Sequence, residues 1–388
     1  MRSIKVLQLA SYRGNIGDNA NVVGTRVLLN RTLGCHITYT NLEYLEYEPD
    51  SRWGGRRFDE GFVQLANAHD LVLIGGGGFF ELAVDKSCTG TPIDLPPERL
   101  REIHTPIVFY ALGFDLSYGI RQPLVDRFRT FLDCLLSRPR TLVSLRNDGS
   151  MENLRQVLGD AYQGAIHKVP DGGFFTVAHA RDHAELPRTG RLMALNLAGD
   201  RLEYRFDERR GEEGNLHVFL EALAEVLNEW FSSRADTHAV LVPHIPEDLN
   251  VIWRLMEHVG PPFSRRRLTV APYIHGEEAQ NYLFDIYRRA QLVLGMRFHA
   301  NVCPIGLGVP TVGLITHPQV AALYRELDLS ERAVVANDGE FGRRIGPLIA
   351  ETLSNAEDIR RRYARLRERL VADTERFHVK IRNLLETT

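Results

Sequence analysis

The stretch LVLGMRFHANVCPIGLGVPTVGL, residues 292–314, places two cation-forming side chains between two apolar runs. The first run predicts a strand that ends at Gly295, and residues 298–307 have the pattern of a helix. Arg297 and His299 therefore lie where the carboxyl end of a strand meets the start of a helix. Ligands of parallel α/β sheets bind at such ends, so the stretch predicts both a fold class and a site.

The rest of the chain repeats this alternation of short apolar runs and longer helical patterns. Strands that are apolar along their whole length and alternate with helices indicate parallel sheets covered on both faces. We therefore expect an α/β fold of doubly wound, Rossmann-like sheets. The expected strands are 4–10, 36–42, 71–78, 106–113, 140–146, 191–197, 238–244, 267–273, 290–296 and 309–315, and the clearest expected helices are 19–34, 122–137 and 214–233.

These elements form two series, separated by a polar, Arg- and His-rich stretch near 178–190. The length of 388 residues suggests about two domains. We predict an N-terminal domain at 1–180, a C-terminal domain at 190–350 and a terminal helix at 355–388. The simplest arrangement has the two domains face to face, with a ligand cleft between them.

The composition is that of a soluble globular protein, with 44% hydrophobic and 25% charged residues. The formal net charge of −3 gives no basic field that would indicate nucleic acid. The four cysteines are scattered, which is typical of a reduced cytosolic chain and offers no zinc motif. We find no signal peptide and no apolar run of about 18 residues, so we expect a cytoplasmic location.

The segment 355–386 reads as one long or broken amphipathic helix. Apolar residues recur every three or four positions, and arginines crowd the other face. The arginines indicate either a solvated face on a packed helix or attraction to anionic lipid headgroups. The second interpretation predicts peripheral contact with the inner face of the membrane.

The turn after the first strand, SYRGNIGDNAN at 11–21, contains candidate ligand-binding residues. Gly14 and Gly17 permit tight turns and a close approach of the backbone. Asn15 and Asp18 lie at the expected helix start, where amides favour an anion or a sugar hydroxyl. A turn with no ligand is the alternative.

Four consecutive glycines follow a buried strand in LIGGGGFFEL, residues 73–82. Glycine adds no side-chain burial and loses backbone entropy. We therefore expect a ligand or the opposing domain to approach this backbone, with Gly76, Gly77 and Glu81 as candidate contacts. The Phe pair at 79–80 is expected in the core or in a cleft wall rather than as a platform for a sugar, and the alternative for Glu81 is an exposed carboxylate at a helix start.

Arg297 and His299 are the strongest site candidates. A buried, unpaired charge would cost several kcal/mol, so we expect the pair to face an anionic ligand. The guanidinium offers a planar fork to phosphate or carboxylate oxygens. The imidazole can donate a hydrogen bond or transfer a proton near neutral pH.

Other strand ends supply supporting charges. Arg146 ends one strand and is expected either to face the cleft or to pair with Asp148. Asp171, His244 and Asp248 also follow strands. By contrast, His179 and His183 have helical i,i+4 spacing, but the sequence offers no further metal ligands beside them. We therefore interpret both as surface residues and expect no bound metal.

Taken in order, these pieces resemble the polysaccharide pyruvyl transferase family. GNIGDNA resembles its N-terminal G-N-x-G-D signature, and LVLIGGGGFF its glycine-rich strand end. SLRNDGS and PDGGFF resemble its R-D-x-x-S and D-x-x-F elements, and the 292–314 stretch resembles its R-x-H block with the trailing G-x-P. The resemblance covers about residues 4–315. One departure is Asn147, which stands where the family usually has Asp.

The resemblance implies a glycosyltransferase-B-like fold and a reaction on a saccharide. Phosphoenolpyruvate would give its enolpyruvyl carbon to two sugar hydroxyls of a cell-surface polysaccharide or its precursor, forming a pyruvate ketal and releasing phosphate. Arg297 and Arg146 would bind the donor, with the acceptor side in the N-terminal domain. His299 would be the general acid, or would bind and protonate the phosphate. Phosphoenolpyruvate is then a co-substrate, and no cofactor is expected.

The remaining residues are assigned less closely. Asp18, Glu81 and Asp171 are unranked candidates for the base, and His244 is a further candidate in the cleft. The rival functions are a glycosyltransferase that uses a nucleotide sugar and a non-catalytic sugar-binding protein. The acceptor sugar, the ketal stereochemistry and the oligomeric state stay open, as does whether the acceptor is free, lipid-linked or polymeric.

Overall fold

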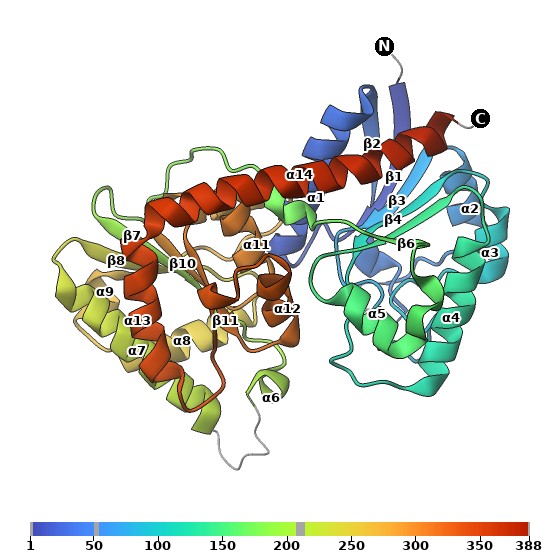
Figure 1. Cartoon of the computed structure of the whole chain (residues 1–388). Coiled ribbons are helices and arrows are strands. Elements are labelled where there is room, and N and C mark those ends of the chain that lie inside the picture. The colour runs from blue at the N-terminus through green and yellow to red at the C-terminus, as the bar shows by residue number, and fades with distance from the viewer. Residues whose placement is uncertain (1–2, 50–53, 207–213, 387–388) are drawn as a thin grey trace. The chain divides into compact units, whose positions relative to one another are not determined.

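The computed structural model describes residues 3–49, 54–206 and 214–386. The chain forms two compact units (Figure 1). Unit 1 comprises Met1–Arg13, Asn21–Gly172 and Arg369–Thr388, and unit 2 comprises Gly14–Ala20 and Gly173–Glu368. The division thus falls inside the first and the last helix. The expectation of a ligand cleft between two domains stays a prediction.

Unit 1 is built on a six-stranded parallel sheet in the order β2-β1-β3-β4-β5-β6. The order reverses between β1 and β3, which is the switch point at which such sheets open a crevice at the strand ends. The strands are β1 Ser3–Ala10, β2 His36–Glu43, β3 Leu71–Gly75, β4 Ile107–Leu112, β5 Thr141–Leu145 and β6 Ile166–Lys168.

Unit 2 contains a second six-stranded parallel sheet, in the order β12-β11-β10-β7-β8-β9. Its switch point lies between β7 and β10. The strands are β7 Arg191–Asn196, β8 Thr237–Leu241, β9 Leu268–Val270, β10 Leu292–Gly295, β11 Thr311–Ile315 and β12 Ala333–Val335.

Helices connect the strands in both units (Figure 1). They are α1 Ile16–Leu33, α2 Glu60–Asn67, α3 Pro97–Glu102, α4 Gln122–Leu136, α5 Ser150–Leu158, α6 Leu202–Arg205, α7 Gly214–Ser233, α8 Asp248–Val259, α9 Phe263–Arg266, α10 Glu277–Arg289, α11 His299–Gly306, α12 Pro318–Glu326, α13 Phe341–Ser354 and α14 Ala356–Glu386.

The predicted α/β class with two doubly wound sheets is confirmed. The central strands are buried along their whole length, as the continuous apolar runs require: β3 and β4 have no exposed residue. Each sheet also has an edge strand that the sequence did not reveal. β6 and β12 have three residues each, and only one residue of each is buried.

The terminal helix α14 is one continuous helix rather than a broken one. Its apolar stripe is buried from Ile359 at one end to Leu385 at the other. Arg361 and Arg362 form ion pairs with Asp358 and Glu331 at the surface. No helix in the described ranges is both long enough and apolar enough to cross a bilayer.

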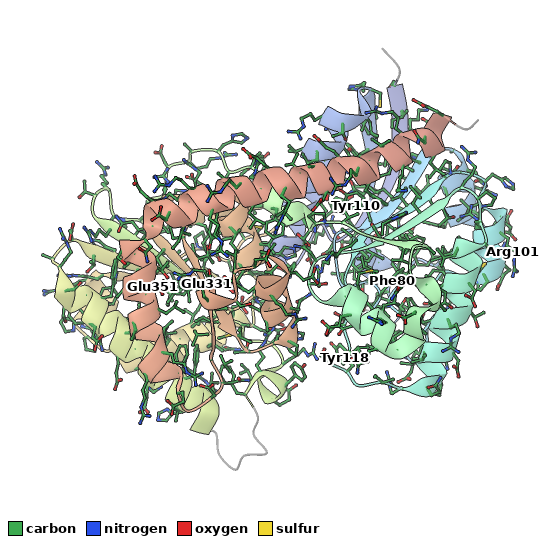
Figure 2. The ribbon with its side chains drawn as sticks, viewed as in Figure 1. Phe80, Arg101, Tyr110, Tyr118, Glu331 and Glu351 are labelled. Atoms are coloured by element: carbon green, nitrogen blue, oxygen red, sulfur yellow. The ribbon has the colours of Figure 1, made fainter. Side chains whose placement is uncertain are left out.

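Within unit 1, α14 is fastened to the sheet through the buried His378. Its Nε2 atom lies 2.8 Å from the hydroxyl of Tyr110 on β4, a residue labelled in Figure 2. Its Nδ1 atom lies 2.6 Å from the hydroxyl of Thr32 on α1. Burial lowers the pKa of His378 to about 3, with Arg31 adding to the effect. The ring is therefore a neutral hydrogen-bonding group at neutral pH.

Candidate functional site

In unit 2, Arg297 follows β10 at the switch point of the sheet. Its backbone N–H donates to Asn196 Oδ1 at the end of β7, at 3.0 Å. Its side chain donates through Nε to Asp248 Oδ2 at 2.9 Å and through Nη2 to Asp200 Oδ1 at 2.7 Å. Nη2 also donates to Asp248 Oδ1. Arg297 Nη1 makes no hydrogen bond to a residue of the described ranges.

Asp248 is the fully buried acceptor that joins the loops of this edge. Besides Arg297, its carboxylate accepts from the backbone N–H groups of Gly199 at 2.9 Å, His244 at 2.9 Å and Ile245 at 3.3 Å. These donors come from the loops that follow β7 and β8. Asp248 thereby fixes three strand ends around one ion pair, which fits the rule that buried charges are paired and hydrogen-bonded.

A second arginine shares Asp200 with Arg297. Arg205 Nη2 donates to the same Oδ1 atom at 3.4 Å, and Arg205 Nη1 donates to Thr316 Oγ1, after β11, at 3.2 Å. Burial alone would raise the pKa of Asp200, but Arg297 and Arg205 outweigh it and lower that pKa. Two guanidinium groups and two carboxylates thus balance in charge. The side chain of Asp200 is the most exposed of these four, at 29%.

His299 begins α11 and lies against the start of α1, which belongs to unit 2. Its Nδ1 atom is 3.7 Å from Asp18 Oδ1. A Cβ atom on Gly17 would stand only 2.5 Å from His299 Cβ and 2.6 Å from Nδ1. Only glycine therefore lets the histidine approach this turn. His299 is 5% exposed, and Phe298 packs edge-on to its ring at 5.2 Å.

The start of α1 is held by contacts within unit 2. Asn15 Oδ1 accepts from the backbone N–H of Gly17 at 2.9 Å, so Asn15 shapes the turn itself. The backbone N–H of Ile16 donates to the carbonyl of His244 at 3.3 Å. These contacts position Asp18 beside His299.

His244 is a buried neutral histidine of this site. Its Nε2 atom lies 2.8 Å from the hydroxyl of Tyr287. Burial lowers its pKa well below the usual value, and the nearby Arg297 and His299 add to this. Its Nδ1 atom is buried and has no hydrogen-bond partner among the described residues. His244 therefore contributes shape and a neutral dipole rather than a charge.

The predicted residues of unit 1 form a separate cluster at the ends of β5 and β6. Arg146 Nε donates to Asp148 Oδ2 at 2.6 Å, and Nη1 donates to Asp171 Oδ2 at 3.5 Å. All three residues are buried. The pairing with Asp148, one of the two alternatives left by the sequence, is thus present. Asn147 accepts from the backbone N–H of Asp171 at 3.0 Å.

The four glycines of unit 1 accommodate contacts within that unit, so a ligand or the opposing domain is not needed to explain them, and the expectation of such an approach stays a prediction. A Cβ on Gly75 would stand 2.4 Å from the Tyr110 carbonyl, and one on Gly77 would stand 2.6 Å from the Phe79 ring. Gly76 has a φ of +95°, and a Cβ on Gly78 would meet the Glu81 carboxylate at 2.6 Å. Close contacts with other residues of unit 1 therefore explain why four glycines stand here in a row.

Glu81 and the aromatic pair belong to the same irregular segment after β3. The Glu81 carboxylate turns back toward Gly78. Glu81 does not stand at the start of a helix, because the next helix, α3, begins at Pro97. Phe79 is buried and stacks on Tyr44, with ring centroids 4.2 Å apart. Phe80 is fully buried in the unit 1 core and is labelled in Figure 2. Of the expected places, core or cleft wall, both rings occupy the core.

The structure thus gathers Asn15, Asp18, His244, Arg297 and His299 in unit 2, and Arg146, Asp171, Gly76, Gly77 and Glu81 in unit 1. Sequence reasoning missed Asp200 and Arg205, because no local pattern marks a residue that pairs with a side chain about a hundred positions away. It also misplaced His183. The side chain of His183 has no exposed surface and lies 3.0 Å from Asp285 Oδ2, so it is not a surface residue.

Comparison with solved structures shows the same two-domain fold in sugar enzymes. A protein described as a putative UDP-N-acetylglucosamine 2-epimerase, from Listeria monocytogenes, has a TM-score of 0.56 at 15% identity, over 93% of this chain and 91% of its own. A glycosyltransferase from Rickettsia africae has a TM-score of 0.56 at 11% identity, over 100% of both chains. The glycosyltransferase SnogD from Streptomyces nogalater has a TM-score of 0.50 at 14% identity, over 99% and 100%.

These likenesses establish a glycosyltransferase-B-like scaffold and no activity, because fold and function separate at such identities. No curated protein matches the chain. The profile of the polysaccharide pyruvyl transferase family, however, matches residues 15–318. That range includes the Asp18–His299 contact and the Arg297 ion pairs described above. The chain therefore belongs to the polysaccharide pyruvyl transferase family.

Proposed function

We propose that this chain transfers the pyruvyl group of phosphoenolpyruvate to a saccharide and releases inorganic phosphate. One sugar hydroxyl adds to C2 of the donor while C3 gains a proton and becomes a methyl group. The C2–O bond to phosphate then breaks, and a second hydroxyl of the same sugar adds to C2. One hydroxyl proton balances the proton gained by C3, and the other leaves with phosphate or a base. The product is a cyclic ketal.

The observation that carries the chemical part of this proposal is the contact between His299 and Asp18. The Asp18 carboxylate lies beside Nδ1 and is proposed to orient the ring, which leaves Nε2 for the reaction. Nε2 is then the atom that exchanges a proton with the reaction. His299 is the proposed acid for C3, or for the leaving phosphate, and Asp18 is its positioning residue. The acceptor is a saccharide of unspecified linkage.

The donor anion is proposed to bind at the two arginines that share Asp200. Arg297 is already neutralised by Asp248 and Asp200, which departs from the simple expectation of an arginine that faces an anion. Asp200 is the more exposed of its two carboxylate partners. We therefore assign Asp248 to holding Arg297, and Asp200 to occupying the anion position until a donor carboxylate or phosphate replaces it.

The test is phosphate release from phosphoenolpyruvate in the presence of a panel of saccharides, with mass spectrometry of each acceptor for an added pyruvate ketal. His299→Gln should lower kcat by about 10²–10⁴-fold. His179→Gln, at an exposed histidine of the same unit, is the matched control and should leave kcat unchanged. Near-normal turnover of a folded His299→Gln variant would remove the assigned role.

A nucleotide-sugar control separates this proposal from the rival glycosyltransferase function. Phosphoenolpyruvate should raise the thermal unfolding midpoint of the wild-type chain, because a ligand that binds only the folded state stabilises it. UDP-sugars should have no such effect. Stabilisation by UDP-sugars together with none by phosphoenolpyruvate would contradict the proposal.

A further inference from the structure

Three potential metal ligands converge on the surface of unit 2, and the proposed reaction uses none of them. His217 and Glu221 are one turn apart on α7, and His258 lies in the last turn of α8. The Nε2 atom of His217 is 3.1 Å from Glu221 Oε1. The rings of His217 and His258 have centroids 4.8 Å apart. One ligand atom from each residue lies within 4.8 Å of the others.

We propose that this cluster binds one divalent transition-metal ion, with Zn²⁺ as the best match. Two imidazoles and a carboxylate are ligands that zinc accepts, at bond lengths of about 2.0–2.2 Å, and three protein ligands leave a fourth position for water. A tetrahedral centre with such bonds separates its ligand atoms by roughly 3.4 Å. The His217–Glu221 pair is already near that separation.

The remaining gap can be closed by side-chain rotation. His217 and Glu221 are 57% and 53% exposed, so their rotamers are not locked by packing. The helices that carry the cluster are firmly placed, because α7 and α8 contribute buried residues to the same core, among them Leu220, Leu223 and Leu255. A rigid backbone with adjustable ligands is a reasonable scaffold for a bound ion.

An ordinary surface ion pair explains the cluster less well. Spacing of i,i+4 accounts for the contact between His217 and Glu221, but not for the second imidazole against the first. A bound metal ion accounts for both contacts, because two imidazoles and a carboxylate can ligate it together. Bound in this way, it would link α7 to α8.

The experiment titrates the untagged full chain with Zn²⁺ alone near neutral pH, by calorimetry. We expect one ion per chain. His217→Ala and His258→Ala should each weaken binding by at least about tenfold, and Glu221→Gln should also weaken it. His275→Ala, at an exposed histidine of the same unit, should leave the affinity unchanged.

Co²⁺ provides a second readout that does not depend on affinity. Visible absorption bands of four-coordinate Co²⁺ should appear with the wild-type chain and be lost in the double variant His217→Ala/His258→Ala. Zinc should also raise the unfolding midpoint of the wild-type chain but not of the double variant. Absence of binding to the wild-type chain, or equal binding by the double variant, would overturn the inference. The inference is independent of the proposed transferase activity.

Discussion

The Nδ1 atom of His299 lies 3.7 Å from Oδ1 of Asp18, although the two residues are far apart in the sequence. Both belong to unit 2, because the first turn of α1 packs with the C-terminal sheet rather than with the sheet of its own strand. The contact gives a histidine at a strand end a partner that orients it. Several predictions about activity depend on this pair.

Removing the charge of Asp18 should weaken the proposed proton transfer by His299, although the histidine itself is still present. We expect Asp18→Asn to lower kcat by about 10–100-fold, since the ring loses the carboxylate that orients it. Asp182→Asn, at an exposed aspartate of the same unit, is the control. Steady-state assays of phosphate release check this, and an unchanged kcat in a folded Asp18→Asn variant would show that the carboxylate is not needed to orient the ring.

A single methyl group at Gly17 should displace His299. The new Cβ would stand 2.5 Å from His299 Cβ, a separation that real Cβ contacts do not show. We expect Gly17→Ala to reduce kcat by about 100-fold through misplacement of the ring. Gly346→Ala is the control, because nothing lies within 4 Å of its added Cβ. Full activity of Gly17→Ala in steady-state assays would mean that this approach is not needed for turnover.

Replacing Asp200 should strengthen binding of the donor. Asp200 shares one oxygen between Arg297 and Arg205, so a donor anion must compete with it. We expect Asp200→Asn to lower KM for phosphoenolpyruvate about threefold to tenfold with little change in kcat, because a fixed negative charge is removed. Initial-rate measurements over a range of donor concentrations check this. A raised KM would show that Asp200 supports the site rather than occupying the anion position.

The fold was largely predictable because each central strand is a continuous apolar run between helical patterns. The 292–314 stretch shows this well: β10, α11 and β11 lie within about two residues of their predicted ranges. β6 and β12 were not predicted, because a strand of three residues with one buried side chain has no such run. Their hydrogen bonds come from the neighbouring strand rather than from local sequence.

The candidate site was predictable in position but not in pairing. The sequence located Arg297 and His299 at a strand end, because that place follows from the alternation of strand and helix. It could not show that Asp248 and Asp200 hold the guanidinium, since ion pairs between distant loops depend on tertiary packing. Nor could it show that the glycines after β3 accommodate Tyr110 and Phe79. Composition indicates a close approach but not what approaches.

The Arg297–Asp248 pair predicts a non-additive effect on stability. Arg297→Met should lower the free energy of unfolding by about 3–5 kcal/mol, because it leaves the fully buried Asp248 carboxylate without its cation. The double variant Arg297→Met/Asp248→Asn should be less destabilised than Arg297→Met alone, since the amide oxygen still accepts backbone hydrogen bonds. Urea unfolding checks both. Arg343→Met, at an exposed arginine, should change stability by less than about 0.5 kcal/mol. Additive losses would argue against the pair.

The buried His378 predicts sensitivity of unit 1 to acid. Its pKa is lowered to about 3 in the folded chain, against 6.5 when unfolded, so the unfolded state binds more protons between these values. The stability that it contributes is complete above 6.5 and declines as the pH falls toward 3. Each pH unit corresponds to about 1.36 kcal/mol. When the pH falls from about 7 to about 5, the free energy of unfolding of His378→Gln should therefore decrease by up to about 2 kcal/mol less than that of the wild-type chain.

Urea unfolding at both pH values measures this difference, with His104→Gln, at an exposed histidine, as control. Equal losses in the wild-type chain and His378→Gln would mean that this ring is not protonated on unfolding.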